Sequence, residues 1–156
     1  MTPVTMRASQ WIASFAIAMG LAACGFAQRT SYERPGESVS DYKRLYVAQD
    51  EGYTWDTGAL IVDRLKAAGR DVRGGPRSEM PEDVDLVVTY EDHWFWDMSM
   101  YMISVKVDFR DAETNALVAT GQSLRTSLKR EDPEYMVDEA IAPLLASGAS
   151  VAGGKR

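Results

Sequence analysis

Apolar and polar residues alternate most regularly in the middle of the chain. Residues 85–96 are rich in β-branched and aromatic side chains, and residues 101–109 alternate with a period of two. This period predicts half-buried strands with one wet face. After a turn at 111–115, residues 117–124 predict a third strand and an antiparallel meander. The face expected to be apolar carries Tyr101, Ile103, Val105, Val107 and Phe109, and the opposite face carries Met102, Ser104, Lys106 and Asp108.

Three further elements are predicted outside the meander. Residues 43–48 are predicted to form a short strand. Residues 57–68 carry an apolar stripe with helical spacing and predict a helix, with Asp56 as a possible N-cap and Gly69 as a C-cap. Asp132-Pro133 opens a final helix in which Pro143 predicts a kink. Residues 73–81 are expected to be a loop.

The order strand-helix-strand-strand-strand-helix predicts an α+β fold. We expect a mixed, mainly antiparallel sheet of about four strands, with two helices on one face. The predicted organisation has four parts: an N-terminal segment at 1–23, a flexible tether at 24–40, an α+β domain at 41–148 and a disordered tail at 149–156.

The N-terminal 23 residues have the composition of a secretory signal. One positive charge, Arg7, precedes an apolar run that starts at Trp11, and no acidic residue occurs before Glu33. The apolar run is too short for a transmembrane helix, which needs about 20 apolar residues. It ends in Leu21-Ala22-Ala23-Cys24, which resembles the lipobox of bacterial lipoproteins.

The lipobox resemblance implies that residues 1–23 are a lipoprotein signal peptide, cleaved before Cys24. It also implies acylation of the Cys24 thiol, with palmitate as a usual acyl chain, so that residues 24–40 form a lipid anchor and tether. Two or more acyl chains hold a protein stably in a bilayer. Gly25 follows the cysteine, where an Asp would signal retention in the inner membrane, so the resemblance implies the outer membrane, facing the periplasm. Two other readings stay open: cleavage by the ordinary signal peptidase after Ala27, and Cys24 as a buried apolar residue.

The composition excludes several kinds of binding partner and catalytic site. The chain has a net charge of −6, and the part after residue 23 is more acidic still because Arg7 is lost, so nucleic acid is not an expected partner. Cys24 is the only cysteine and His93 the only histidine. Acylation of Cys24 leaves no thiol for catalysis, and one histidine rules out a multi-histidine zinc site. We expect no enzymatic activity and no cofactor.

The segment from Tyr90 to Asp97 is the one place where a site could lie. On a regular strand Glu91, His93 and Asp97 share one face, an incomplete ligand shell for a divalent cation, and a solvated strand end is the commoner explanation. Aromatic residues also anchor protein interfaces, so Trp94, Trp96 and Tyr101 are interface candidates. Trp94 is expected to pack inward and Trp96 to remain available for contact.

The element order and the lipobox together resemble small periplasmic lipoproteins that assist envelope machinery. Examples are the penicillin-binding-protein activator lipoproteins and the N-terminal domain of the Tol-Pal β-propeller protein. Segments 83–90, 92–97 and 108–111, with Tyr101, resemble an uncharacterised family of small periplasmic α+β lipoproteins. The resemblance implies a membrane-anchored, non-enzymatic interaction or assembly module with an envelope protein partner. The alternative is a lipoprotein that binds a small ligand or a metal.

Overall fold

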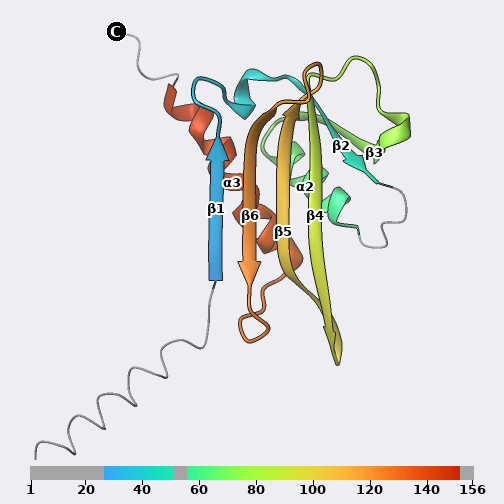
Figure 1. Ribbon diagram of the computed structural model, residues 1–156, viewed down its shortest axis with the longest axis vertical. Coiled ribbons are helices and arrows are strands. Elements are labelled where there is room, and N and C mark those ends of the chain that lie inside the picture. Colours follow the sequence, from blue (N-terminus) through green and yellow to red (C-terminus); the bar gives the residue numbers. More distant parts are fainter. Residues whose placement is uncertain (1–26, 51–55, 152–156) are drawn as a thin grey trace, which may run out of the picture.

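Six strands form one mixed sheet, and two helices cover one of its faces (Figure 1). The computed structural model describes residues 27–50 and 56–151, and within them the strand order is β1-β6-β5-β4-β2-β3. The elements in chain order are β1 (Ala27–Glu33), η1 (Val39–Asp41), β2 (Arg44–Gln49), α2 (Thr57–Ala67), β3 (Asp71–Pro76), η2 (Arg77–Glu79), β4 (Leu86–Asp97), β5 (Ser99–Asp111), β6 (Leu117–Arg125) and α3 (Pro133–Val151).

The α+β class and the two helices on one face are confirmed, but the sheet has six strands instead of about four. β2 is parallel to both β3 and β4, while β4, β5, β6 and β1 are antiparallel in turn. The two strands that the sequence did not predict, β1 and β3, are the two edges of the sheet.

β1 occupies much of the segment that was predicted to be a flexible tether. Its seven residues pair antiparallel with β6, from Ala27 opposite Arg125 to Glu33 opposite Ala119. Residues 27–32 are all exposed, so the strand has no buried face. Its sequence therefore lacks the alternation of apolar and polar residues from which a strand could be predicted. η1 follows at Val39–Asp41, closed by a capping box between Ser38 and Asp41. The prediction of a flexible tether over residues 24–40 is therefore wrong for β1 and for the start of η1, which are ordered parts of the domain.

β3 replaces the first half of the predicted loop at 73–81. It contains Gly74-Gly75-Pro76, residues that are poor strand formers and that mark an edge when they do occur in a sheet. Gly74 is required by packing, because a Cβ there would lie 2.7 Å from Cγ2 of Val62 on α2. Tyr46 on the neighbouring β2 donates a hydrogen bond to the carbonyl of Pro76 at 2.9 Å.

The core lies between the sheet and the two helices. α2 ends at Ala67 with Ala68 as its C-cap, one residue before the predicted Gly69. Gly69 follows directly with a φ of 75°, and the Gly69 and Arg70 amides donate to the carbonyls of Lys66 and Leu65. Asp56 stands at the N-cap position, but its side chain makes no capping hydrogen bond. α3 continues through Pro143 to Val151, so the first residues of the predicted tail are helical. The largest fully buried side chains include Leu45, Ile61, Leu65, Leu86, Met102, Phe109, Met136 and Ile141.

A buried ion pair fastens α3 to β6. Arg125 donates to Glu139, whose same oxygen also accepts a hydrogen bond from Ser123 Oγ at 2.7 Å. Burial alone would raise the pKa of Glu139, but the hydrogen bonds from Ser123 and Arg125 outweigh it and lower that pKa. Arg125 is also covered by the ring of Tyr135, 5.9 Å from its guanidinium carbon.

Two predicted parts, the signal peptide and the acylated Cys24, lie outside the described residues, as do residues 152–156 of the tail. Across residues 27–50 and 56–151, no helix is both long and apolar enough to cross a membrane.

Gly121 on β6 supports the first prediction, because α3 rests directly on it. A Cβ at this position would lie 1.9 Å from the carbonyl oxygen of Ala140, a contact that only movement of the helix backbone could relieve. Gly121→Ala is expected to lower the free energy of unfolding by about 1–3 kcal/mol, as overpacking of a core typically does. Chemical denaturation measures it. Ser31→Ala, at the exposed cross-strand partner of Gly121, is the control and should change little.

Candidate contact surface at the end of the β4–β5 hairpin

The β4–β5 hairpin extends beyond the rest of the sheet. β2 pairs with β4 only at Leu86–Val88, and β6 pairs with β5 only from Arg110 to Ser104. From Trp94 to Met102 the two strands pair with each other alone, down to Asp97 opposite Ser99. Met98 makes the turn with a φ of 57°, in the left-handed region. The hairpin therefore projects as a two-stranded ribbon at the lower end of the molecule in Figure 1.

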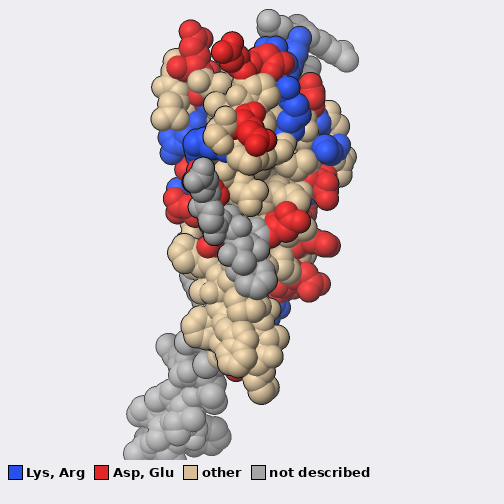
Figure 2. Space-filling view, turned by 90° about the vertical axis from the view of Figure 1, so that its right-hand side faces the viewer, with Lys and Arg blue, Asp and Glu red and all other residues tan. Residues whose placement is uncertain are grey.

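Large apolar side chains are exposed on this projection. We call Phe95, Trp96, Met98 and Met100 the hairpin tip; Leu128, on the loop between β6 and α3, is also exposed. Met98 is 91% exposed, Leu128 75% and Trp96 67%. In the space-filling view the lower end of the molecule is largely free of charged side chains on the side shown (Figure 2). Single exposed apolar residues are ordinary, but a group of them marks a contact surface.

A β-bulge separates the core half of the hairpin from this tip. The register shifts between His93, which pairs with Ser104, and Trp94, which pairs with Met102. Beyond the bulge the alternation of β5 changes phase, so Met102 is 1% exposed and lies in the core. The predicted alternation therefore holds from Val105 to Phe109 but is wrong for residues 101–103, because one extra residue reverses the facing of a strand.

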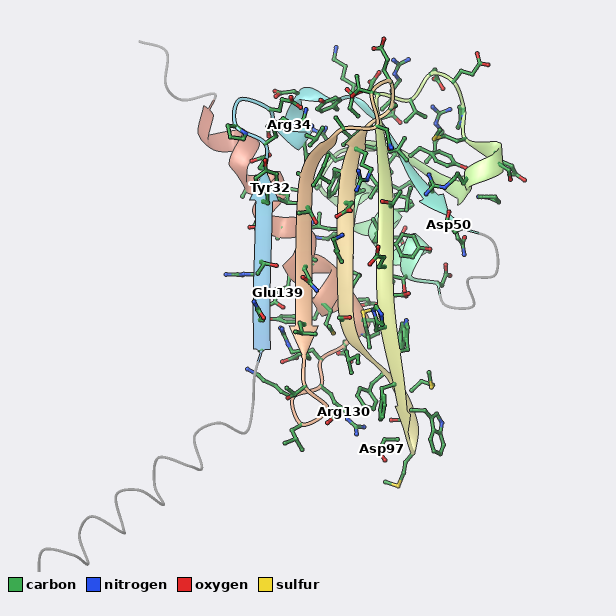
Figure 3. The ribbon with its side chains drawn as sticks, in the orientation of Figure 1. Tyr32, Arg34, Asp50, Asp97, Arg130 and Glu139 are labelled. Carbon is green, nitrogen blue, oxygen red and sulfur yellow. The ribbon has the colours of Figure 1, made fainter. Side chains whose placement is uncertain are left out.

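Tyr101 is not available to a partner, contrary to its prediction as an interface residue. It is 7% exposed, with the Phe95 ring edge-on at 5.9 Å and the Arg130 guanidinium 3.9 Å from its ring centroid. Arg130 also donates to Asp97 at 2.9 Å, and these two residues lie next to each other in Figure 3. The loop between β6 and α3 is thereby held against the hairpin, which places Leu128 near the same end.

The two tryptophans of β4 occupy the positions predicted for them. Trp94 is half-buried and packs against the main core cluster, and its Nε1 donates to Asp92 Oδ2 at 2.8 Å. Asp92 also accepts a hydrogen bond from the buried Thr57. Trp96 lies on the projecting ribbon and is exposed.

The structure does not bring the candidate metal ligands together. His93 Nδ1 lies 3.2 Å from Ser104 Oγ, and Asp97 is engaged by Arg130. Asp97 is also four residues further along the strand than His93, which is about 13 Å at the rise of a β-strand. Within residues 27–50 and 56–151, no group of three His, Cys, Asp or Glu side chains could hold a metal ion.

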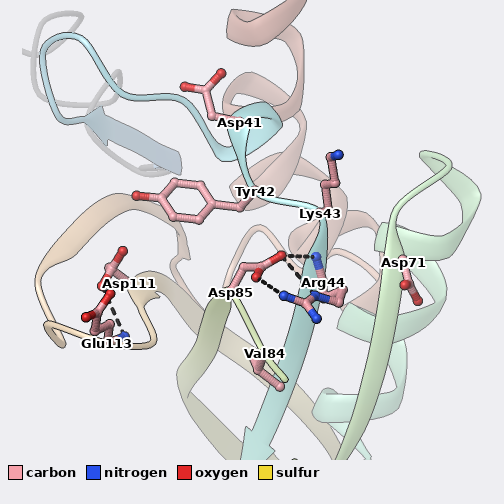
Figure 4. Close-up of a pocket in the computed structure, with 9 residues that line it drawn as sticks. All are labelled: Asp41, Tyr42, Lys43, Arg44, Asp71, Val84, Asp85, Asp111 and Glu113. Atoms are coloured by element: carbon pink, nitrogen blue, oxygen red, sulfur yellow. Dashed lines mark hydrogen bonds and ion pairs between the residues drawn. The ribbon is translucent and has the colours of Figure 1, made fainter. Parts of the chain in front are cut away.

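A shallow acidic cavity of about 730 Å³ lies at the opposite end of the sheet (Figure 4). Arg44 binds Asp85 through its backbone N at 3.0 Å and Nε at 3.2 Å, and these hydrogen bonds lower the pKa of Asp85 to about 2. Burial, followed by a hydrogen bond to Glu37, raises the pKa of Tyr42 to about 12. This cavity has no signature in the sequence, because its residues come from four separate segments of the chain. It is lined by Asp41, Tyr42, Lys43, Arg44, Asp71, Val84, Asp85, Asp111 and Glu113.

Sequence reasoning missed Leu128, which stands in a polar loop without periodicity. The structure also separates three neighbouring methionines, with Met98 and Met100 exposed and Met102 buried. Position distinguishes them, since Met98 makes the turn, Met100 follows it closely and Met102 lies further into the sheet.

Comparison with known proteins identifies the architecture. No protein-family model matches the sequence, and no curated protein matches it. Two structures of the PelC dodecamer from Paraburkholderia phytofirmans resemble the chain with TM-scores of 0.57 and 0.56, at 12% and 14% identity. Each comparison covers 77% of this chain and 98% of the PelC chain. A minor lipoprotein from Acinetobacter baumannii has a TM-score of 0.35 at 13% identity, covering 72% of this chain and 96% of that one, too low to carry an argument. These likenesses show the fold alone.

Replacing the two tryptophans should separate packing from exposure. Trp94→Ala is expected to lower the free energy of unfolding by about 3 kcal/mol, the lower part of the range for a buried tryptophan, since part of its ring stays in water. Trp96→Ala should cost less than about 0.5 kcal/mol, as surface substitutions do. Chemical denaturation of both variants measures the difference, and equal small losses would contradict the placement of the inner face of β4.

The Arg44–Asp85 pair predicts a response to acid. A carboxylate whose pKa is lowered by folding stabilises the native state above its unfolded pKa of about 3.9 and loses that contribution as the pH falls towards 2. Asp85→Asn should therefore flatten the fall in unfolding free energy between about pH 4 and pH 2. Asp63→Asn, at an exposed position on α2, serves as the control and should leave that slope unchanged. Urea titrations at several pH values measure the slope.

Proposed function

We propose that this chain is a lipoprotein anchored to a membrane of the cell envelope through acylated Cys24, and that it acts there as a non-enzymatic contact module. The single observation that carries this proposal is the hairpin tip, a projecting group of exposed aromatic and methionine side chains on a domain with a well-packed core. Such groups bind other surfaces. The lipobox resemblance supports the anchor, and Gly25 after the cysteine supports the outer membrane, facing the periplasm.

A non-enzymatic role is favoured by the surroundings of the one histidine. His93 and Ser104 approach each other, but both lie on the exposed part of the sheet and neither lines a cavity described above. A nucleophile needs a base that is itself oriented and donors for the developing negative charge, arranged around a site that excludes water. A surface pair without these groups is a local polar contact.

Self-assembly is a second candidate. The two PelC structures that share this fold are dodecamers. Within the part of the chain that the structure describes, β1 is an open edge, whose seven residues are paired with β6 on one side only. An unpaired edge can accept a strand from another chain. Metal binding, one of the alternatives suggested by the sequence, is not favoured, because the described residues assemble no group of three metal-ligating side chains.

Purification of the tagged, full-length protein from detergent-solubilised envelopes tests the contact role. Mass spectrometry of the co-purified proteins distinguishes an envelope partner from copies of the chain itself, and light scattering in the same detergent gives the oligomeric mass. Recovery of a monomer with only general outer-membrane proteins would count against both forms of the proposal.

The anchor makes its own prediction. Wild-type protein should incorporate radiolabelled palmitate, and Cys24→Ser should incorporate none, because the thiol that carries the lipid is gone. Ala27→Leu is the matched control. It removes the small residue that the ordinary signal peptidase would need for cleavage after Ala27, so it should leave labelling unchanged. Absence of label in the wild type would overturn the anchor.

A further inference from the structure

The hairpin tip has features that bear on which surface it contacts. Its side chains include an exposed tryptophan at the end of a two-stranded ribbon and an exposed methionine at the turn. Tryptophan is enriched where a protein meets the boundary between lipid tails and headgroups, because its ring is apolar and its N–H is polar. Two of the charges at this end of the molecule, Asp97 and Arg130, bind each other, while Glu131 and Asp132 line a shallow hollow beside Met100 and Tyr101.

The register of the strands places this tip beside the point where the N-terminal segment joins the sheet. Ala27 pairs with Arg125 at the end of β6, and the adjacent Leu124 pairs with Ser104, which in turn pairs with His93. The start of β1 is therefore level with the base of the projecting ribbon. Figure 1 shows both at the lower end of the sheet, with β1 running upward from it.

Simple chain lengths then limit how far the tip can be from a bilayer. From the level of Ala27, about that of Trp94, the ribbon continues for four residues to Met98, or about 13 Å. Cys24 precedes Ala27 by three residues, which span at most about 11 Å when fully extended. The anchor point is thus no farther from the sheet than the tip, and acyl chains leaving Cys24 for the membrane bring the tip to the same surface.

We propose that the hairpin tip inserts into the bilayer surface as a second membrane contact beside the lipid anchor. This inference rests on the proposed acylation of Cys24. Two exposed apolar side chains, those of Trp96 and Met98, enter the boundary between headgroups and acyl chains, and the sheet stands with its strands rising from the membrane. Amphipathic elements bury their apolar faces to about 5–10 Å in this zone, a depth that the ribbon is long enough to reach.

A second membrane contact would fix the orientation of the domain, which the lipid anchor alone does not. A lipid on a short link holds the domain near the membrane but leaves it free to turn. The ribbon adds a rigid second point, because Arg130 and Tyr101 clamp the β6–α3 loop against it. The acidic cavity at the opposite end of the sheet then faces away from the bilayer.

Quenching of tryptophan fluorescence by brominated lipid tests the contact directly. Full-length acylated protein is reconstituted in vesicles of phosphatidylethanolamine and phosphatidylglycerol that contain brominated phosphatidylcholine, and the emission is compared with that in unbrominated vesicles. Wild type should lose part of its emission. Trp96→Phe should lose much less, whereas the matched control Trp94→Phe, altered at the half-buried tryptophan, should lose as much as wild type. Met98→Glu should reduce the quenching of Trp96 by placing a charge at the turn.

Palmitate labelling of the same samples separates the two proposals. Labelled protein whose quenching is the same in wild type and Trp96→Phe would overturn the membrane contact and leave the anchor intact. A blue-shifted Trp96 emission without bromine quenching would also overturn it, because the tip would then be covered by protein. Unlabelled wild-type protein would overturn the anchor and with it this inference.

Discussion

The antiparallel pairing of β4 with β5 is the interaction on which the rest of the structure depends. The pairing extends from Leu86, opposite Asp111, to Asp97, opposite Ser99. Its register shifts once, at the bulge between His93 and Trp94. Its upper half supplies the central strands of the sheet, with which β2 and β6 pair and against which α3 packs, while α2 packs on the neighbouring β2 and β3. Its lower half has no further strand on either side among residues 27–50 and 56–151, so the same ladder continues from the interior of the protein to its surface.

Because of the bulge, one hairpin can both contribute strands to the core and expose apolar side chains at its end. A regular strand would carry Tyr101 and Ile103 into the core face and turn Met102 outward. With the phase reversed, Met102 fills the core beside Trp94, while Tyr101 closes the other side beneath Phe95 and Arg130. The core is thus sealed at the base of the ribbon, and beyond this seal Trp96 and Met98 remain largely in water. Their apolar surface contributes little to the stability of the described part of the chain, and a group of such residues is the usual sign of an external partner.

Elements with a buried face could be predicted from the sequence, and elements without one could not. The meander and the helix beginning at Thr57 have apolar residues at the spacing of their structure, and Gly69 lies one residue beyond the C-cap of that helix. β1 has no buried face, and β3 is made partly of glycine and proline, so hydrogen bonding to a neighbouring strand holds them, and composition does not reveal it. At the candidate site, Trp94 and Trp96 were placed correctly, but Tyr101 was not, because a bulge leaves no mark in the spacing of apolar residues.

The position of β1 also decides how the molecule bears mechanical load. A pull on the segment before Ala27 acts along the axis of β1, and the hydrogen bonds from β1 to β6 lie across that axis. All of them are then strained together, in shear, and none can open ahead of the others as in the unzipping of a hairpin from its end. β6 is in turn held to α3 by the Arg125–Glu139 pair and by the close packing at Gly121. A domain attached to a membrane through this strand would transmit tension into its own core before it lost its link to the anchor.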